Sequence, residues 1–511
     1  MNKLLLYFTV FICGGAVLAI EILGTRILGP YYGVNIFLWS ALISVTLIAL
    51  SAGYMIGGRI ADRQKNYNLL TVIIALAGIL TILIPLFRNG VIEITESMGL
   101  RLSVLISSLI LFFPALTLLG MVSPCAIKLR TQSLDVVGTR AGDLYSVSTI
   151  GSVLAALITG YYLIPKIGVV KLTVGTGIIL VITAIIIFVS GRKNKYKVTA
   201  VPLILLLAFI SINFFPAERA EPGKGILTVR QSMYAEVRVM DLDQNRFLLI
   251  DGGIHSAIDK TTKKNILPYA WVLDITKNLE PYAGDMLLIG LGGGSVLKSF
   301  YEDNWDVEVV EIDPVIEEVE KKYFNPVPGF DNIYIEDGRE FLRKTDHQYD
   351  LVVLDAFGSS SVPFHLITAE SFLLARQHLR EDGLIAVNIE AIGWHDIIVG
   401  SIAKTLRQVF KYVTALPIAE PPDQLGNVII LASDIPFELK EPLKREYSKP
   451  DYRFSDEYEQ NHAWDNRFVP EMKDALILTD DLNPVGIWAD RINLRARKEL
   501  HELLGDNSFL W

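Results

Sequence analysis

The chain has 511 residues, of which 51% are hydrophobic, and its formal net charge is −9. This length exceeds what one ordinary core needs, so we expect two or more domains. The acidic balance argues against broad electrostatic binding to nucleic acid, and we predict no such partner. The two cysteines, Cys13 and Cys125, lie in apolar runs, which argues against a disulfide framework and against a zinc cluster. We therefore predict no metal site.

Apolar segments fill the first part of the chain. Each approaches the roughly 20 residues that cross a bilayer as a helix. Helices are the expected form because backbone polar groups in hydrocarbon must be paired within their own segment. The first segment is interpreted as a membrane helix, since no small-residue cleavage site follows it. The segments cover 4–24, 36–57, 68–87, 102–125, 144–165, 168–190 and 198–215. The sequence thus predicts a transmembrane domain of about seven helices over 1–216, surrounded by the lipids of the cell membrane.

Basic residues gather in the second, fourth and sixth loops, for example Arg59, Lys128 and Arg192. The positive-inside rule places these loops and the N-terminus in the cytoplasm. Seven crossings would then put the C-terminal part of the chain outside the cell.

The first segment carries Glu21 close to its end, followed by Arg26. An ionisable residue in a membrane span is costly to bury and often functional, so Glu21 is a candidate substrate residue; a structural ion pair or an interfacial anchor is the alternative. Small residues such as Gly151 recur in the fifth segment and favour close helix packing.

The composition changes near residue 217, where charged residues become frequent. Short alternating strands predict a small antiparallel β subdomain over 225–262. From 263 to 440, strand-length apolar runs alternate with helical segments, which predicts a doubly wound α/β domain with a parallel sheet. The remaining residues, 441–511, are expected to form a helical C-terminal extension.

A glycine turn, GLGGGS, follows the first strand of this domain directly. Gly290, Gly292, Gly293 and Gly294 let the backbone approach a ligand without interference from a Cβ atom. Glu311 comes 21 positions after Gly290 at the tip of the second strand, where a carboxylate accepts both hydroxyls of a ribose. A tight turn with a solvated acid is the alternative. Asp313, two residues further on, joins the candidate nucleotide-binding set.

Two later strands also end in an acid. Asp337, followed by Gly338, is placed to receive an adenine amino group, and Asp355 ends the fourth strand at the mouth of the same cleft. A lone acid at such a place often caps a helix. Several successive strands that end in acid or glycine instead predict a binding cleft at the carboxyl edge of the sheet.

At these residues the chain resembles the membrane-fused branch of the spermidine synthase (polyamine aminopropyltransferase) family, which has a major-facilitator-like N-terminal segment. The resemblance rests on the following motifs: GGRIADR at 57–63, GDLYSVSTIGSVLAALITGYYLIPKIG at 142–168, IDGGIHS, GLGGGS, EID, EDGREF, LDAF and LTDD at 478–481. It implies a sulfonium donor, S-adenosylmethionine or its decarboxylated form. It also implies Asp355 as the acid that orients and deprotonates the attacking amine. A donor made in the cytoplasm conflicts with seven crossings, so the side of the membrane that holds the C-terminal part stays open.

The sequence departs from this family mainly at carboxylates that hold amino groups. Gly293 and Gly358 stand where the family has acids, and the Tyr-x-Glu stretch becomes Tyr269-Ala270-Trp271, which leaves Tyr269 as a tentative substrate residue. His255 replaces a glutamine and is assigned to the donor site. Asp480 and Asp481 are candidate replacement acids; the alternative is that LTDD caps a helix.

Three functions follow. The first is transfer of an aminopropyl or related group from the donor to an amine. The second is an S-adenosylmethionine-dependent methyltransferase that acts on a lipid or a membrane-delivered acceptor. The third is a transporter or sensor in which the adenosyl-binding domain regulates the helices; because seven segments are about half of a twelve-helix transporter, this role would need a homodimer.

Overall fold

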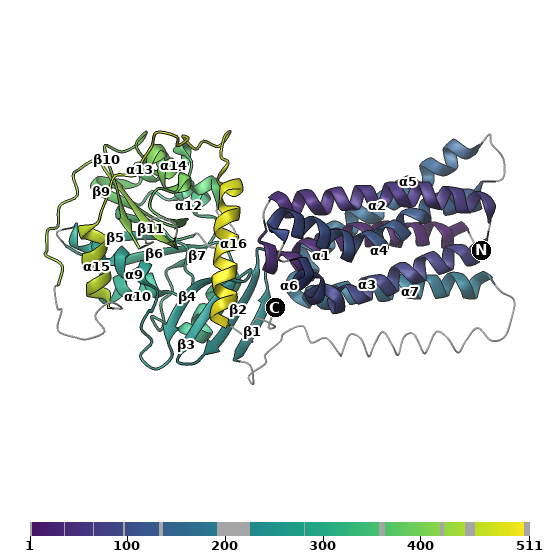
Figure 1. Cartoon of the computed structure of the whole chain (residues 1–511), viewed down its shortest axis with the longest axis horizontal. Coiled ribbons are helices and arrows are strands. Elements are labelled where there is room, and N and C mark those ends of the chain that lie inside the picture. The colour runs from purple at the N-terminus through teal and green to yellow at the C-terminus, as the bar shows by residue number, and fades with distance from the viewer. Residues whose placement is uncertain are drawn as a thin grey trace. The chain divides into compact units, whose positions relative to one another are not determined.

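The chain divides into two compact units, which are described separately (Figure 1). The first contains the N-terminal helices and the second contains both β-sheets. The computed structural model describes the following residues: 3–34, 36–64, 66–95, 98–131, 136–191, 225–280, 282–356, 363–418, 424–444 and 455–504.

The first unit is a bundle of long apolar helices. Within its described residues, six helices are long and apolar enough to cross a membrane, and they match the first six predicted segments. The seventh predicted segment, 198–215, lies outside the described residues. The helices are α1 (Lys3–Tyr32), α2 (Ile36–Arg63), α3 (Tyr67–Thr95), α4 (Leu100–Arg130), α5 (Val137–Ile158), which continues through η3 (Thr159–Leu163) and α6 (Ile164–Ile167), and α7 (Val169–Gly191).

Small residues bring pairs of these helices into backbone contact. A Cβ atom added at Gly151 of α5 would lie 2.2 Å from the carbonyl oxygen of Phe11 in α1. One added at Gly53 of α2 would lie 2.3 Å from the carbonyl oxygen of Thr117 in α4. The close packing predicted for the fifth segment is therefore confirmed at Gly151, since a larger side chain there would force α1 and α5 apart.

The second unit begins with a four-stranded sheet in the order β1-β2-β3-β4. Pairing of β2 with β3 and of β3 with β4 is antiparallel, as predicted for this region. The strands are β1 (Ile226–Gln231), β2 (Glu236–Leu242), β3 (Asn245–Ile250) and β4 (Gly253–Asp259).

The larger sheet has seven strands in the order β10-β11-β9-β8-β5-β6-β7. The strands are β5 (Asp285–Ile289), β6 (Asp306–Glu311), β7 (Ile333–Ile335), β8 (Tyr349–Leu354), β9 (Leu379–Ile392), β10 (Tyr412–Pro417) and β11 (Leu425–Ser433). Helices and turns alternate with them: α9 (Pro268–Leu273), η6 (Asp274–Asn278), α10 (Ser295–Glu302), α11 (Pro314–Val319), η7 (Glu320–Phe324), α12 (Gly338–Lys344), η8 (Phe364–Leu366), α13 (Ala369–Gln377), α14 (Ile397–Leu406), α15 (Asp456–Asp465) and α16 (Val485–Leu504).

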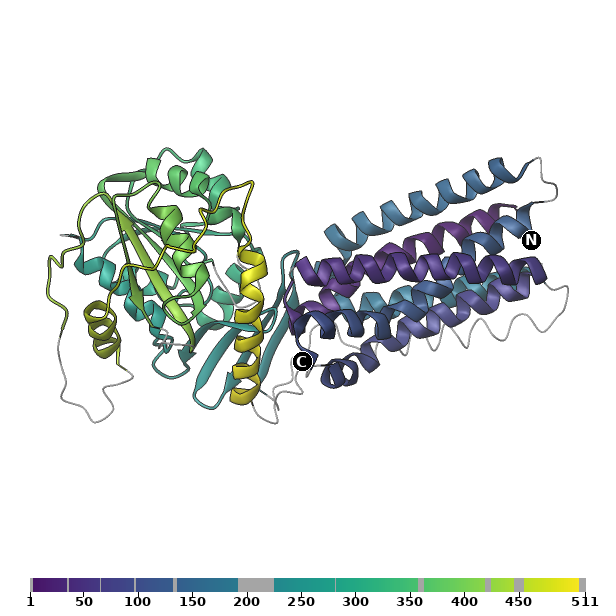
Figure 2. The same cartoon turned by 45° about the horizontal axis from the view of Figure 1, so that its top comes forward.

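Helices cover both faces of this sheet, which confirms the doubly wound α/β fold. Leu287 and Ile289 of β5 pack with α12, α13 and α14, while Met286 and Leu288 pack on the opposite face with α9, α10 and α11. This alternation is the period of two that a buried strand imposes. Helix α16 contacts β4 and β9, one strand from each sheet (Figure 2).

The doubly wound sheet is parallel as predicted over most of its strands, but the prediction was wrong at one edge. Strands β9, β8, β5, β6 and β7 are parallel, but β11 runs antiparallel between β9 and β10. The physical reason is the connection. Helix α14 connects β9 to β10, which lies at the edge of the sheet. The chain then turns back after β10, and β11 pairs between β10 and β9 in the opposite direction. An antiparallel neighbour of this kind needs no second crossover helix.

Candidate functional site

The site lies at the carboxyl ends of β5 and β8. The chain leaves β5 toward β6 and β7 on one side and later returns to place β8 and β9 on the other. The connections therefore diverge between β5 and β8, which opens a crevice at the carboxyl edge of the sheet. The glycine turn follows β5 there, and Asp355 follows β8.

The glycine turn has a conformation and a packing that favour glycine. Gly290 has φ +103°, and a Cβ atom there would lie 2.3 Å from the carbonyl oxygen of Asp355. The Gly293 amide donates a 2.7 Å hydrogen bond to Ser256 Oγ on β4, and a Cβ atom at Gly293 would lie 2.9 Å from the Ser256 Cβ. The small sheet thus packs directly against the turn, and an aspartate at position 293 would not fit unless Ser256 moved.

Glu311 ends β6 beside this turn, and its carboxylate is buried. One oxygen accepts a 3.0 Å hydrogen bond from the Leu291 amide, and the other accepts a 2.9 Å bond from the Asp313 amide. Burial raises the pKa of Glu311, while these amide donors oppose the rise. The Ile312 amide also donates to the carboxylate, which therefore keeps about one lone pair for a further donor such as a ribose hydroxyl.

Asp313 has a local structural role in this geometry. Its carboxylate accepts a hydrogen bond from the Val315 amide and caps α11, and it also accepts one from the Ser232 hydroxyl. The side chain is 3% exposed. Its assignment to the donor site stays a prediction, because both contacts are explained by helix capping and packing.

Asp355 lies in a network that crosses three strands and one helix. Its Oδ1 accepts a 2.7 Å hydrogen bond from Asn388 Nδ2 on β9, and Asn388 Oδ1 accepts a 2.9 Å bond from Asn427 on β11. The hydroxyl of Tyr269 on α9 donates to the same carboxylate. Burial raises the pKa of Asp355 to about 7, although both donors favour its ionised form. A carboxyl group with this pKa can take or release a proton near neutral pH.

His255 contributes an unsatisfied polar atom close to the turn. It is on β4 next to Ser256, and its Nε2 is buried without a hydrogen-bond partner in the described structure. Burial lowers the pKa of His255 to about 4, so the ring is neutral at physiological pH. Its backbone carbonyl lies 3.5 Å from the Tyr269 hydroxyl. A buried ring nitrogen without a partner is what a ligand with a polar group can satisfy.

Glu390 is a further acid that the sequence analysis did not single out. It is on β9, two residues beyond Asn388, and pairs in register with Asn427. The period of two places Glu390 and Asn388 on the same face of the sheet. Burial, followed by the charge of Glu499, raises the pKa of Glu390 to about 7. The only signal in the sequence was an acid two positions after a polar residue in an apolar strand.

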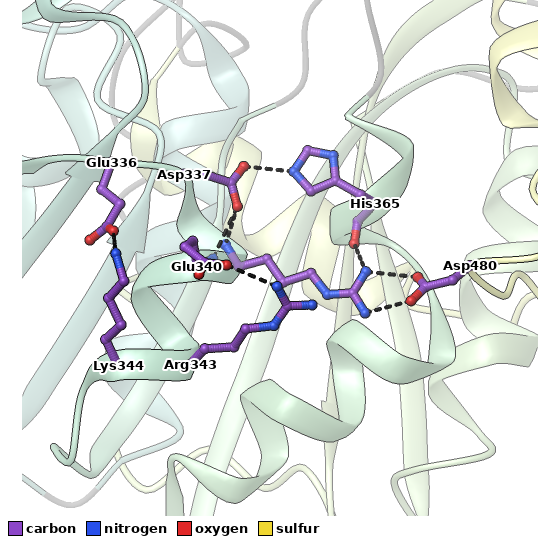
Figure 3. A network of polar contacts seen from close by, with 8 residues as sticks. Glu336, Asp337, Glu340, Arg343, Lys344, His365 and Asp480 are labelled. Atoms are coloured by element: carbon purple, nitrogen blue, oxygen red, sulfur yellow. Dashed lines mark hydrogen bonds and ion pairs between the residues drawn. The ribbon is translucent and has the colours of Figure 1, made fainter.

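Asp337, which the sequence analysis assigned to the adenine amino group, lies at the start of α12. Its Oδ1 accepts 3.0 Å hydrogen bonds from the amides of Arg339 and Glu340, so it caps the helix. Its Oδ2 lies 2.7 Å from His365 Nε2 (Figure 3). The following Gly338 is buried, and a Cβ atom there would lie 2.4 Å from a Ile289 methyl carbon. Packing against Ile289 therefore explains the glycine at position 338. The structure also places His365 in contact with Asp337, and the sequence analysis had not identified this histidine.

Comparison with known proteins identifies the second unit. The profile of the spermine/spermidine synthase domain matches residues 229–434. This part of the chain is a spermine/spermidine synthase domain.

Related proteins place the domain in a family of transferases. The chain is 26% identical to the polyamine aminopropyltransferase of Vibrio vulnificus over 244 residues, which cover 45% of this chain and 79% of the relative. It is 23% identical to polyamine aminopropyltransferase 2 of Aquifex aeolicus over 456 residues, covering 85% and 88%. That similarity therefore extends into the helical unit. Among solved structures, the spermidine synthase of Thermotoga maritima matches at 22% identity with a TM-score of 0.35, over 42% of this chain and 74% of that one.

The remaining predicted residues lie apart from the crevice of the synthase domain or have other partners. Asp480 forms a bidentate ion pair with Arg339, with both distances at 2.7 Å. Asp481 is exposed and has no partner in the part of the chain that the structure describes. Neither acid caps α16, because Asn483 Oδ1 accepts the Val485 amide. Glu21 is in α1 of the first unit, where Thr46 of α2 donates to its carboxylate. Gly358 lies outside the described residues.

The synthase domain offers an adenosyl sulfonium donor a consistent set of contacts. Glu311 has free acceptor capacity, the turn at Gly292 and Gly293 presents backbone close to β4, and His255 has an unused ring nitrogen. Asp337 Oδ2, which contacts His365, can accept a further hydrogen bond. The residues that are present therefore fit the adenosyl part of such a donor, whereas position 293 offers no acid for an amino group.

Proposed function

We propose that this protein transfers an aminopropyl group from decarboxylated S-adenosylmethionine to a primary amine. The observation that carries the proposal is the Asp355 carboxyl, which lies beside the glycine turn at the divergence between β5 and β8 and has a pKa near 7. In such a transfer, the amine nitrogen attacks the carbon attached to the sulfonium sulfur. A C–N bond forms, the C–S bond breaks, and its electron pair leaves with the neutral thioether methylthioadenosine.

In this scheme, Asp355 accepts the proton of the attacking amine. An ammonium group has no lone pair to attack with, so a base must remove its proton before or during the reaction. The hydrogen bonds from Asn388 and Tyr269 hold the carboxylate in one orientation, so that the amine is aligned with the donor. The sulfonium supplies its own activation, and alignment is the main task left to the protein.

Glu390 is proposed as a second contact for the acceptor. It lies on the same face as Asn388, one strand away from Asp355, and the spacing of paired strands puts the two acidic residues about 8 Å apart at their Cα atoms. Side chains that start from Cα atoms at this separation can reach the two ends of a small diamine, one carboxyl group holding the attacking nitrogen and the other holding the far ammonium. Glu390 would then replace the acid that the family has at position 271.

We further propose that the six apolar helices hold the enzyme in the cell membrane. Their lengths and hydropathy meet the requirement for spanning helices. A membrane-bound enzyme can receive its acceptor from the lipid phase, so a lipid amine is included among the acceptors to be tested.

A product assay tests the reaction. Full-length protein in detergent would be incubated with decarboxylated or intact S-adenosylmethionine, together with diamines, polyamines or an amine lipid, and the products measured by mass spectrometry. We expect methylthioadenosine and an aminopropylated amine from the decarboxylated donor. Formation of adenosylhomocysteine from the intact donor would instead support a methyltransferase, which the absence of an acid at Gly293 allows. Binding of adenosyl ligands without any turnover would favour a transporter or a sensor.

A further inference from the structure

The segment 478–483 lies against the segment 364–370, which follows β8 in the chain. Two hydrogen bonds join them: the Ala369 amide donates to the Leu478 carbonyl at 2.9 Å, and the Asn483 side-chain Nδ2 donates to the Phe364 carbonyl at 2.9 Å. The hydroxyl of Thr368 donates to Asp480 Oδ1 at 2.9 Å. The C-terminal segment is thus bonded to both ends of the stretch that contains His365.

Arg339 extends this contact to the start of α12. Its two terminal nitrogens bind the two oxygens of Asp480 at 2.7 Å each, and one of them also donates to the His365 carbonyl at 3.1 Å. Its side chain is 11% exposed, whereas that of Asp480 is 46% exposed. A fork-to-fork pair of this kind fixes both position and orientation. Arg339 is two residues after Asp337, so the same helix turn carries the arginine and the acid that His365 contacts.

The result is one continuous chain of contacts from Asp480 to Asp337 (Figure 3). Asp480 holds Arg339, Arg339 holds the His365 backbone, and the His365 ring lies 2.7 Å from Asp337 Oδ2. The His365 ring thereby decides which lone pairs of the Asp337 carboxylate remain for a ligand. A shift of this backbone would move the ring off Oδ2 and change which lone pairs of that oxygen face a ligand, while the amides of Arg339 and Glu340 still hold Oδ1.

We propose that Asp480 is a positioning residue for the donor site, because through Arg339 it keeps His365 on Asp337 and so preserves selection of a base with an exocyclic amino group. This inference rests on the proposed function and on the expectation from the sequence that Asp337 receives the adenine amino group of the donor. It gives the C-terminal segment a role in donor recognition, although Asp480 itself contacts no donor.

Binding of two small nucleosides tests the inference without any turnover. Methylthioadenosine has an amino group on its base, and methylthioinosine has a carbonyl oxygen at the same place, which an acceptor-only carboxylate disfavours. Their dissociation constants would be measured by calorimetry for full-length wild type and for Asp480→Asn. We expect wild type to prefer methylthioadenosine, and we expect the variant to lose about tenfold in affinity for it, the effect of one charge-assisted hydrogen bond. The affinity for methylthioinosine should change much less.

Further variants separate positioning from general stability. Asp474→Asn, which changes an exposed acid six residues before Asp480, is the matched control and should behave as wild type. Arg339→Lys keeps the charge but loses the fork, and should resemble Asp480→Asn; His365→Ala should lose the same preference directly. A merely structural role would lower the melting temperature of Asp480→Asn and leave the ratio of the two dissociation constants unchanged.

The outcomes distinguish this inference from the proposed function. An unchanged ratio in Asp480→Asn, with wild type showing a clear preference, would overturn the positioning role and leave the transfer reaction intact. A reduced ratio in a protein that forms no methylthioadenosine would support the positioning role and count against aminopropyl transfer. Wild-type protein that binds neither nucleoside would overturn both.

Discussion

Asn388 Nδ2 donates a 2.7 Å hydrogen bond to Asp355 Oδ1, and this contact joins two neighbouring parallel strands at the edge where the site lies. Asn388 is 3% exposed and is itself held by Asn427. The donated bond favours the ionised form of a carboxyl that burial otherwise keeps protonated. The activity and the pH dependence of the protein should therefore depend on this pair.

Replacement of Asp355 by asparagine should lower kcat by at least about 100-fold, the contribution expected of a positioned general base. Asparagine keeps the size of the side chain and can still accept from Asn388, so the fold should survive. The rate of methylthioadenosine formation measures the effect. Asp346→Asn, an exposed acid before β8, is the control. Retention of more than about half of the activity in Asp355→Asn would rule out the assigned role.

The activity should rise with pH through about 7, because only ionised Asp355 can accept the proton. Substitution of Asn388 by leucine removes a donor that stabilises the charged form and should shift this limb to higher pH by about one unit or more. Profiles of kcat/KM against pH for wild type and variant make the comparison. If the rise in kcat/KM moves to lower pH in the variant, or does not move at all, another group must titrate.

The Asp355 carboxyl should also make stability depend on pH. Its folded pKa of about 7 exceeds the ordinary aspartate value of 3.8, so its contribution to stability is fully present below that lower value and is lost as the pH rises to about 7. The loss is on the order of 4 kcal/mol. Asp355→Asn, which has no charge to bury, should melt at a higher temperature than wild type near pH 8, and the gap should shrink at acidic pH. Equal gaps at both pH values would contradict the assigned pKa.

Glu390→Gln should raise KM for a diamine by about tenfold or more, while kcat changes less, because the residue is proposed to hold the far ammonium and not the attacking nitrogen. A monoamine acceptor has no such group and serves as an internal control, since its KM should not rise. Initial rates with both acceptors give the answer. A similar rise for the two amines would indicate a general disturbance of the crevice.

Much of this protein follows from local patterns in its sequence. A spanning helix needs about twenty apolar residues, and a buried parallel strand needs a short apolar run before a turn, so both are visible without any partner. The glycine turn, Glu311 and Asp355 could be predicted to lie at strand ends, because such sheets expose the residues there. These features depend on neighbouring residues alone.

The tertiary structure decided what depends on residues far apart in the chain. The insertion of β11 beside β9, the contact of Asn388 with Asp355 and the partner of Asp480 all require the order of strands, which periodicity does not encode. Asp480 and Arg339 are 141 positions apart, so no spacing rule could pair them. The sequence alone showed Gly293 only as a position where the family has an acid. The fold shows that Ser256, which is distant in sequence, occupies the space that an acidic side chain would need.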